Sequence, residues 1–246
     1  MSAPDPVSGD GRHGDHRRSR PDSAADQAAA VIERVVERVF RSVAAVRDDL
    51  VAGYRAAGGR MCDSDVTAVR EALIARLVRE RSVAVGMGVI VAPGLLVDRP
   101  LRMEWWQADT EAAPVMLEVD LNPASVGFYD YAAAEWFTVP RRTGRRHVVG
   151  PYVDVHGTDR YLLTLTLPVL ADGRFVGVAG ADVPVARFET LVLRELGDLA
   201  ADVVVVNVED RVVLSTSPRW LVGDRAVLTD APCRALDEPD WRVVVT

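Results

Sequence analysis

The sequence is poor in cysteine and has no long apolar run. Its two cysteines, Cys62 and Cys233, stand far apart and lack the spacing of a metal site. They could pair, but two free thiols in a reducing compartment is the simpler interpretation. No stretch approaches the ~18 consecutive apolar residues of a membrane span, and the N-terminal residues contain no apolar core like that of a secretory signal. These absences predict a cytoplasmic protein without membrane contact.

Acidic residues outnumber basic ones, and the common catalytic motifs are absent. The chain has 29 Lys and Arg against 36 Asp and Glu, a net charge of −7, so nucleic acid is not expected as a partner. The sequence contains no HExxH, CxxC or GxxxxGK[ST] motif and no Ser or Cys in a nucleophile elbow. We therefore expect no metal, no cofactor and no enzymatic activity. The remaining enzymatic alternative is an acid–base pair of Asp154 with His156 or with Asp182.

Composition divides the chain into three parts. Residues 1–22 are rich in Pro, Gly, Ser, Asp and Arg, which predicts a disordered tail because too little apolar surface is available for burial. With 49% hydrophobic residues overall, the chain can build a core. We expect one domain over residues 23–196 and a C-terminal β unit over residues 197–246.

A long helix is predicted to begin at Ser23 and to end at Gly58-Gly59. At 1.5 Å per residue it would span about 50 Å, more than one small domain covers. We therefore expect part of its apolar stripe to meet a second copy in a homodimer; the alternative is that it packs along its own sheet. The stripe repeats at steps of three and four residues: Val31, Ile32, Val35, Val36, Val39, Phe40, Val43, Val46, Leu50 and Tyr54.

Beyond this helix the pattern becomes mainly β. A second helix is predicted over 64–81, followed by strands over 83–93, 101–107 and 115–121, helical turns over 125–136, an Arg-bearing loop, and a strand over 147–155. Asp172-Gly173 joins two alternating apolar runs, which is a strong hairpin signal. A helix over 185–195 and three more strands follow. Helices first and then a mainly antiparallel sheet describe an α+β fold, with the long helix packed on the sheet and further helices flanking it.

Three polar residues on two predicted strands could line a pocket: Asp182, Tyr152 and Asp154. Val176, Val178, Gly180 and Asp182 share one strand face if side chains alternate, so Gly180 would leave space beside the carboxylate. An Asp at that place could equally cap the following helix. Tyr152 and Asp154 are two apart and also face one way. Aromatic faces attract cations, and a nearby carboxylate would hold an ammonium group in place; spacing alone leaves each aromatic open to a core role.

The run W-F … G-P-Y-x-D … Y-x-L-T-L-T-x-P-V … D-G-x-x-x-G-V-A-G-A-D-V resembles the Cache (PAS-like, PDC) family of small-molecule sensor domains. The likeness is strongest over residues 100–195. It implies a PAS-like sheet and a non-catalytic, ligand-binding role. The amino-acid-sensing branch of double-Cache domains carries a Tyr, then Arg-x-Trp-Tyr, then Tyr-x-Asp, then an Asp that ends a Gly-rich strand. The positions that match this pattern are Tyr129, Trp136, Phe137, Tyr152, Asp154 and Asp182.

One departure from this pattern concerns the ligand. The family's arginine, which grips an amino acid's carboxylate, would stand two residues before Trp136, where this chain has Ala134. Glu135 adds a further acid. The resemblance therefore implies a small amine without a carboxylate, its ammonium group held by Asp154 and Asp182. An amino acid remains the alternative if Arg141, Arg142, Arg145 or Arg146 replaces the clamp.

The resemblance also bears on partners. Sensors of this family are joined to a signalling module, and none is recognisable in these residues, so an unknown downstream regulatory protein is expected. The C-terminal unit either completes the sheet or is a shortened second Cache module. A scaffold with a vestigial pocket is the third functional alternative.

Overall fold

The computed structural model describes residues 24–108, 113–155, 160–197, 199, 201–228, 231 and 233–245. The predicted tail over 1–22, the predicted cap Ser23 and His156 lie outside these residues.

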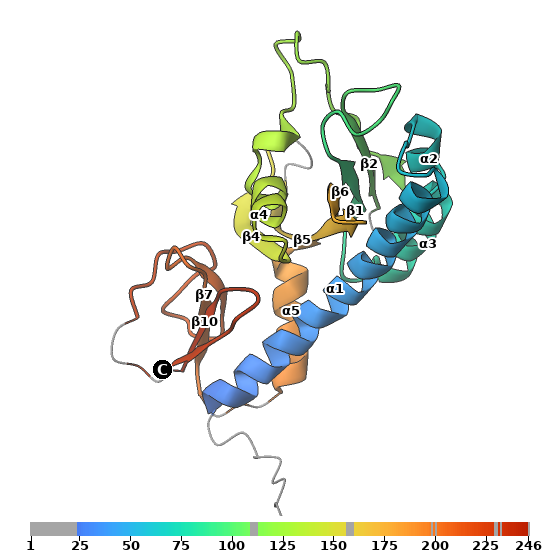
Figure 1. Ribbon diagram of the computed structural model, residues 1–246. Helices are drawn as coiled ribbons and strands as arrows, with labels where there is room; N and C mark the ends of the chain where they lie inside the picture. Colours follow the sequence, from blue (N-terminus) through green and yellow to red (C-terminus); the bar gives the residue numbers. More distant parts are fainter. Residues whose placement is uncertain are drawn as a thin grey trace, which may run out of the picture.

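The predicted long helix is α1 (Ala24–Ala56), and every residue of its predicted apolar stripe is buried. Gly58 and Gly59 take φ values of 59° and 77° and end the helix. The stripe packs on the chain's own sheets and on α5 (Val185–Leu196). Figure 1 shows α1 running from the small C-terminal sheet to the far side of the large one. The stripe is thus covered within one chain, and a homodimer through α1 stays a prediction.

The predicted second helix is two helices, α2 (Asp63–Thr67) and α3 (Arg70–Glu80). The first starts one residue earlier than expected, because the Cys62 backbone N–H donates to the Asp65 carboxylate at 2.8 Å. Arg70 of α3 donates to the fully buried Glu104 at 2.7 Å and ties the helix to the sheet.

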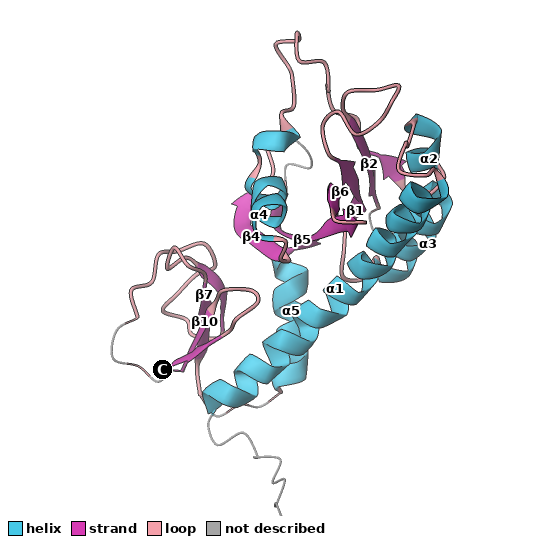
Figure 2. Ribbon diagram, viewed as in Figure 1, coloured by secondary structure: helices cyan, strands magenta, loops and turns pink. Residues whose placement is uncertain are grey.

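The large sheet has six antiparallel strands. Their spatial order is β3 (Val115–Met116), β2 (Arg102–Gln107), β1 (Gly86–Val91), β6 (Arg174–Pro184), β5 (Tyr161–Ala171) and β4 (His147–Val153). One face packs on α1 and the other on a smaller apolar cluster. The third predicted strand, over 115–121, is reduced to the two residues of β3. This arrangement confirms the α+β class (Figure 2).

The β5–β6 hairpin is confirmed. Asp172 and Gly173 both have positive φ, 52° and 78°, as a type I′ turn requires. Near the turn, the pairing register shifts between Val169 and Leu170. This bulge moves Val176 to the α1 side of the sheet, so the expectation that Val176 shares a face with Asp182 is wrong.

Two short elements lie over the second face of the sheet. These are the 3₁₀ turn η1 (Tyr131–Ala133) and α4 (Glu135–Thr143). They begin later than the turns predicted over 125–136, and α4 takes Arg141 and Arg142 out of the expected loop. Gly144, at φ 66°, ends α4.

The C-terminal residues form a sheet of their own and do not extend the large one. Its order is β8 (Val212–Ser215), β7 (Val203–Val206), β10 (Arg242–Val245) and β9 (Cys233–Ala235); β9 was not predicted. The Trp241 ring packs edge-on against Phe188 of α5 at 5.7 Å. Asn207 donates to the Gly150 carbonyl at 3.1 Å. These contacts attach the small sheet to α5 and β4.

Charged side chains such as Glu33, Arg34 and Glu37 cover the exposed face of α1, opposite its apolar stripe. In the described ranges, no helix carries an apolar run of the length and hydropathy that a bilayer crossing needs. The same ranges hold no group of three or more His, Cys, Asp or Glu arranged for a metal ion. Both cysteines are free.

Candidate functional site

A cavity of about 590 Å³ lies at the β4 end of the large sheet. It carries four carboxylates and four aromatic rings, and the described residues that line it include no Lys, Arg or His. Such a lining attracts cations, through both charge and the negative faces of the rings. The lining residues are Glu118, Val119, Asp120, Gly127, Phe128, Tyr129, Asp130, Ala133, Ala134, Trp136, Tyr152, Val153, Asp154 and Val155.

Four of the predicted site residues meet in this cavity: Tyr129, Trp136, Tyr152 and Asp154. They come from three separate segments, the loop after β3, the first turn of α4, and β4 with the residue that follows it. Ala134, the position of the missing arginine, also lines the wall. Its backbone is extended (φ −68°, ψ 144°) and immediately precedes α4, so that it orients the first turn of the helix, which carries Trp136.

Phe137 lies apart from the other predicted residues. Its side chain is fully buried between Tyr131 and Phe175, with ring centroids 5.4 and 5.5 Å away. It also packs edge-on against Trp136, at 6.3 Å and 88°. The structure therefore places Phe137 behind Trp136, in the core and not on the cavity wall.

Asp182 is buried behind the wall, with 5% of its surface exposed. Its carboxylate accepts two hydrogen bonds, one at 3.1 Å from Trp105 Nε1 and one at 2.7 Å from Thr164 Oγ1. Burial raises the pKa of Asp182 to about 7, and the nearby charge of Asp154 adds to the rise, while the two hydrogen bonds oppose it. The carboxylate has about four acceptor positions, so these two bonds leave capacity for more.

Trp105 is a part of the site that sequence reasoning missed. Its indole crosses β1 from β2 and reaches Asp182 on β6. The crossing is possible because β1 has glycines there: a Cβ on Gly86 would lie 2.8 Å from both Trp105 Nε1 and Asp182 Oδ2. The indole also lies over Gly180, so the space expected beside Asp182 is filled by Trp105. Glycines inside a strand mark such close approaches, and the G-M-G of β1 was the available signal.

Thr164 was also missed, because its position depends on the bulge. An unbulged two-residue hairpin continues the pairing of Ala171 with Arg174 and would place Leu163 opposite Asp182. The register shift brings Thr164 there instead. From this position Thr164 Oγ1 contacts both Asp182 and, at 2.9 Å, the hydroxyl of Tyr152.

The two tyrosines of the cavity lie in the field of the two acids. Burial raises the pKa of Tyr129 and of Tyr152, and the charges of Asp154 and Asp182 raise both further. Both phenols are therefore neutral hydrogen-bonding groups at physiological pH.

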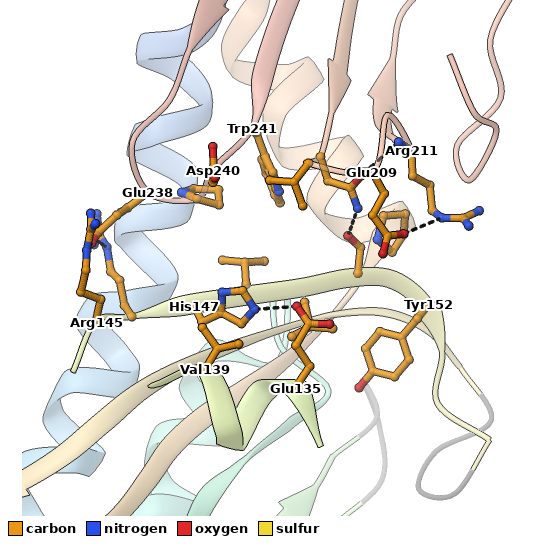
Figure 3. Close-up of a pocket in the computed structure, with 18 of the residues that line it drawn as sticks. Glu135, Val139, Arg145, His147, Tyr152, Glu209, Arg211, Glu238, Asp240 and Trp241 are labelled. Atoms are coloured by element: carbon orange, nitrogen blue, oxygen red, sulfur yellow. Dashed lines mark hydrogen bonds and ion pairs between the residues drawn. The ribbon is translucent and has the colours of Figure 1, made fainter. Parts of the chain in front are cut away.

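A larger groove, of about 860 Å³, separates α4 and β4 from the C-terminal sheet (Figure 3). Its charges are mixed in sign, and several are paired with one another: Glu135 contacts His147 at 2.8 Å, and Arg145 and Arg146 contact Glu238 at 2.7 and 2.6 Å. Glu135 thus belongs to the groove, although its neighbours Ala134 and Trp136 line the cavity. The hydrogen bond with His147 lowers the pKa of Glu135. We regard the cavity as the better candidate site, because its charges share one sign.

The arginines proposed as a replacement clamp point elsewhere. Arg146 bridges Glu37 of α1 and Glu238, and its guanidinium lies 4.8 Å from the centre of the Phe40 ring. Arg142 and Arg145 line the groove. None of the arginines from 141 to 146 is among the residues that line the cavity.

In fold, the chain is similar to ligand-binding domains of chemoreceptors and to extracellular domains of histidine kinases. No protein-family model matches the chain. A segment of 77 residues is 32% identical to the methyl-accepting chemotaxis protein TlpQ of Pseudomonas aeruginosa. This segment covers 31% of this chain and 11% of that receptor. The ligand-binding domain of the P. aeruginosa amino acid chemoreceptor PctC, solved with GABA, matches with a TM-score of 0.57 at 16% identity, over 91% of this chain and 96% of that one. The extracellular domain of a proposed histidine kinase matches with a TM-score of 0.60 at 15% identity, over 91% of each chain.

The chain shares the fold of these ligand-binding and extracellular domains. The resemblance to the Cache family stated from its motifs is confirmed at the level of the fold. The alternative acid–base pair of Asp154 with His156 is not tested, because His156 lies outside the described residues.

The predicted cytoplasmic location is contradicted. The Cache-fold neighbours include extracellular domains of histidine kinases, and the relative in sequence is a chemotaxis receptor. Composition reports whether a domain folds in water, and water lies on both sides of a membrane. Two unpaired cysteines are equally compatible with either side, so the expectation of a reducing compartment had no independent basis.

Proposed function

We propose that this Cache domain is a sensor module whose cavity binds a small organic amine. The observation that carries the proposal is the lining of the cavity, where four carboxylates and four aromatic rings face a space of about 590 Å³ without a described basic residue among them. A cation entering this space gains Coulombic attraction from the acids and cation–π attraction from the rings.

The ammonium end of the ligand is proposed to lie between Asp154 and the faces of Trp136, Tyr129 and Tyr152. Asp182, which is linked to Tyr152 by two hydrogen bonds through Thr164, adds negative charge to the same end. Phe137 is proposed to act indirectly, since its edge-on contact with Trp136 fixes the orientation of the indole.

The ligand is proposed to lack a carboxylate. Ala134 supplies a methyl group where the amino-acid-sensing pattern has arginine, and Arg145 and Arg146 are paired with Glu238 outside the cavity. A carboxylate would face Glu118, Asp120 and Asp130 without a described positive partner, which costs binding energy.

The signal is proposed to leave through a separate module or partner protein. TlpQ and PctC are chemoreceptors by name, and the matched segment covers only 11% of TlpQ. We infer that the chain acts as the ligand-binding part of an extracellular sensory system; the identity of its output partner is open to pull-down experiments.

A thermal-shift series tests the proposal directly. 1-Butylamine, γ-aminobutyrate and butyrate share a four-carbon chain and differ only at their ends; polyamines, betaines and amino acids complete the panel. A ligand at a hundredfold excess over its Kd stabilises the fold by about 2.7 kcal/mol, which raises Tm by about 5–10 °C. We expect the largest shift among the three from 1-butylamine and none from butyrate.

Variants then assign the shift to the cavity. Asp154→Asn and Trp136→Phe should weaken it, and Asp182→Ala should abolish it. Arg142→Gln, whose side chain belongs to the groove, is the matched control and should leave it unchanged. A shift by butyrate, or an undiminished shift in Asp154→Asn, contradicts the proposal, and no shift by any compound favours a scaffold with a vestigial pocket.

A further inference from the structure

The cavity is connected to buried Asp182 by a chain of three hydrogen-bonding groups. The Tyr152 hydroxyl lies 2.9 Å from Thr164 Oγ1, which lies 2.7 Å from Asp182 Oδ1. On the other side, Trp105 Nε1 donates to Asp182 Oδ2 at 3.1 Å. In Figure 3 the Tyr152 hydroxyl points away from the C-terminal sheet. The chain therefore starts at the cavity wall and ends at a carboxyl group that is 5% exposed.

Proton counting fixes the direction of these bonds when Asp182 is ionised. A carboxylate only accepts, and a threonine hydroxyl has a single proton. Thr164 therefore gives its proton to Asp182, and Tyr152 gives its own to Thr164. The Tyr152 oxygen can then only accept from the cavity, which suits the N–H groups of an ammonium ion.

The direction reverses when Asp182 is protonated. Its Oδ2 faces the indole N–H of Trp105, which can only donate, so the oxygen with an acceptor beside it is Oδ1. A proton there is donated to Thr164, and Thr164 in turn donates to Tyr152. The Tyr152 O–H is then released toward the cavity as a donor.

We infer that Thr164 and Trp105 are specificity-determining residues: Trp105 confines the proton of Asp182 to Oδ1, and Thr164 transmits the protonation state of Asp182 to Tyr152. Together they decide whether the cavity wall accepts or donates a hydrogen bond. The ionised state favours ammonium ligands, and the protonated state favours ligands with a free acceptor. The inference deepens the proposed function and depends on it only for the role of the cavity.

The groups around Asp182 leave it the pivotal titrating group. From the strands packed on it come Thr164, Trp105 and Gly86, none of which titrates near neutral pH. The titratable groups that act on it are Asp154, Tyr129 and Tyr152. The raised pKa of Asp182, about 7, places the change within reach of ordinary pH variation.

The chain provides its own control for Thr164. Thr166 lies two residues further along β5, on the same face and buried, and within the described residues its hydroxyl finds no hydrogen-bond partner. Thr164→Val and Thr166→Val make the same chemical change on the same strand. Only the first interrupts the path from Tyr152 to Asp182.

The experiment uses ligand-free protein labelled with [¹³Cζ]tyrosine. The chain has five tyrosines, and Tyr152→Phe assigns the Tyr152 signal. Between pH 5 and 9 we expect that signal to show one inflection near pH 7 in the wild type and in Thr166→Val. The inflection should be lost in Asp182→Asn and in Thr164→Val, while Thr164→Ser, which keeps the hydroxyl, should restore it.

Three results would overturn the inference. The first is an inflection in Thr164→Val as large as in the wild type, which would show that the charge of Asp182 acts through space. The second is the absence of the inflection from the wild type, and the third is its survival in Asp182→Asn. The other tyrosine signals report whether each variant is folded. Should Thr164→Val be unfolded, Thr164→Ala, which also removes the hydroxyl, decides in its place and must lose the inflection.

A binding series with 1-butylamine gives a second readout. Its affinity should fall as the pH drops below about 7, by at most about tenfold per pH unit for a single proton, and Thr164→Val should flatten this dependence where Thr166→Val does not. If 1-butylamine does not bind at all, the proposed ligand class fails, while the tyrosine titration still tests the relay.

Discussion

Asp182 carries the largest electrostatic cost among the residues of the site. A carboxyl group 5% exposed, with Asp154 nearby, favours its neutral form, and the hydrogen bonds from Trp105 and Thr164 only partly offset this. Burying a carboxyl group at the end of an otherwise apolar strand face costs free energy, which a residue with a purely structural role would avoid. Its cost is the physical reason to regard it as functional.

The cost of Asp182 predicts a pH-dependent stability. Because its pKa rises from 3.8 to about 7 on folding, the folded state binds the proton more tightly. The stabilisation is complete below about pH 4 and is lost as the pH rises through about 7, with a slope of about 1.4 kcal/mol per pH unit between these limits. Urea unfolding at pH 5, 6, 7 and 8 should show this fall in the wild type and a flatter profile in Asp182→Asn.

The control for this prediction is Asp130→Asn, at an exposed carboxylate on the rim of the cavity. Its pH profile should follow the wild type. A wild-type stability that rises between pH 5 and 7 would mean that Asp182 is ionised and stabilised in the folded state, and the prediction would then be wrong.

Among the elements, β1 determines the shape of the site through the side chains it omits. Gly86 and Gly88 let the Trp105 indole lie across the strand and bond to Asp182. At Gly88 an added Cβ would meet the Glu104 carbonyl oxygen as well as the indole. The strand therefore supports the Trp105 indole, which packs on its glycines, and does not itself contact the proposed ligand.

This role predicts opposite effects of alanine at two glycines. Gly86→Ala should destabilise the fold by about 1–3 kcal/mol, because its Cβ would lie 2.8 Å from Trp105 Nε1 and from Asp182 Oδ2. Gly53→Ala, inside α1 with nothing nearer than 3.9 Å, should stabilise it by about 0.5–1 kcal/mol. Denaturant unfolding of the two variants measures both, and a neutral Gly86→Ala would show that the indole is not confined there.

Sequence patterns predicted those elements whose signals are local. The stripe of α1, the Asp172-Gly173 hairpin and α5 follow from periodicity and turn chemistry. The bulge at Val169/Leu170 is not local information, because it depends on pairing across the hairpin. The bulge turns Val176 to the other face of the sheet and places Thr164 opposite Asp182. For this reason the hydrogen-bonded path from Tyr152 to Asp182 could not be predicted.

The predicted site residues show the same division. Tyr129, Trp136, Tyr152 and Asp154 come together as the family resemblance implied. The resemblance did not distinguish the aromatic ring that lines the cavity from the ring that packs behind it. Phe137, adjacent to Trp136 in sequence, therefore had to be located by the packing of α4 over Tyr131 and Phe175.

At the scale of the whole molecule, α1 and α5 join the two sheets. α1 contacts both sheets, α5 contacts the small sheet through Phe188 and Trp241, and Tyr152 and Val153 border both the cavity and the groove. A ligand that moves β4 would thus act on the groove and on the small sheet beyond it (Figures 1 and 3).

The attachment of the small sheet can be tested at Trp241. This side chain is 2% exposed and packs on Phe188, so Trp241→Ala should cost about 3–5 kcal/mol. Trp220→Ala, at a half-buried ring that packs on the small sheet's own cluster, should cost less. Equal losses in the two variants would show that the Trp241 contact adds nothing between the sheets.

The central claim is that the cavity holds a cation. A crystal structure of the protein with 1-butylamine, or with an amine retained through purification, tests it most directly. We predict density in the cavity with nitrogen within hydrogen-bonding distance of Asp154 or Tyr152 and over the face of Trp136. Density confined to the groove beside Glu238, or a bound carboxylate gripped by an arginine, would contradict the claim.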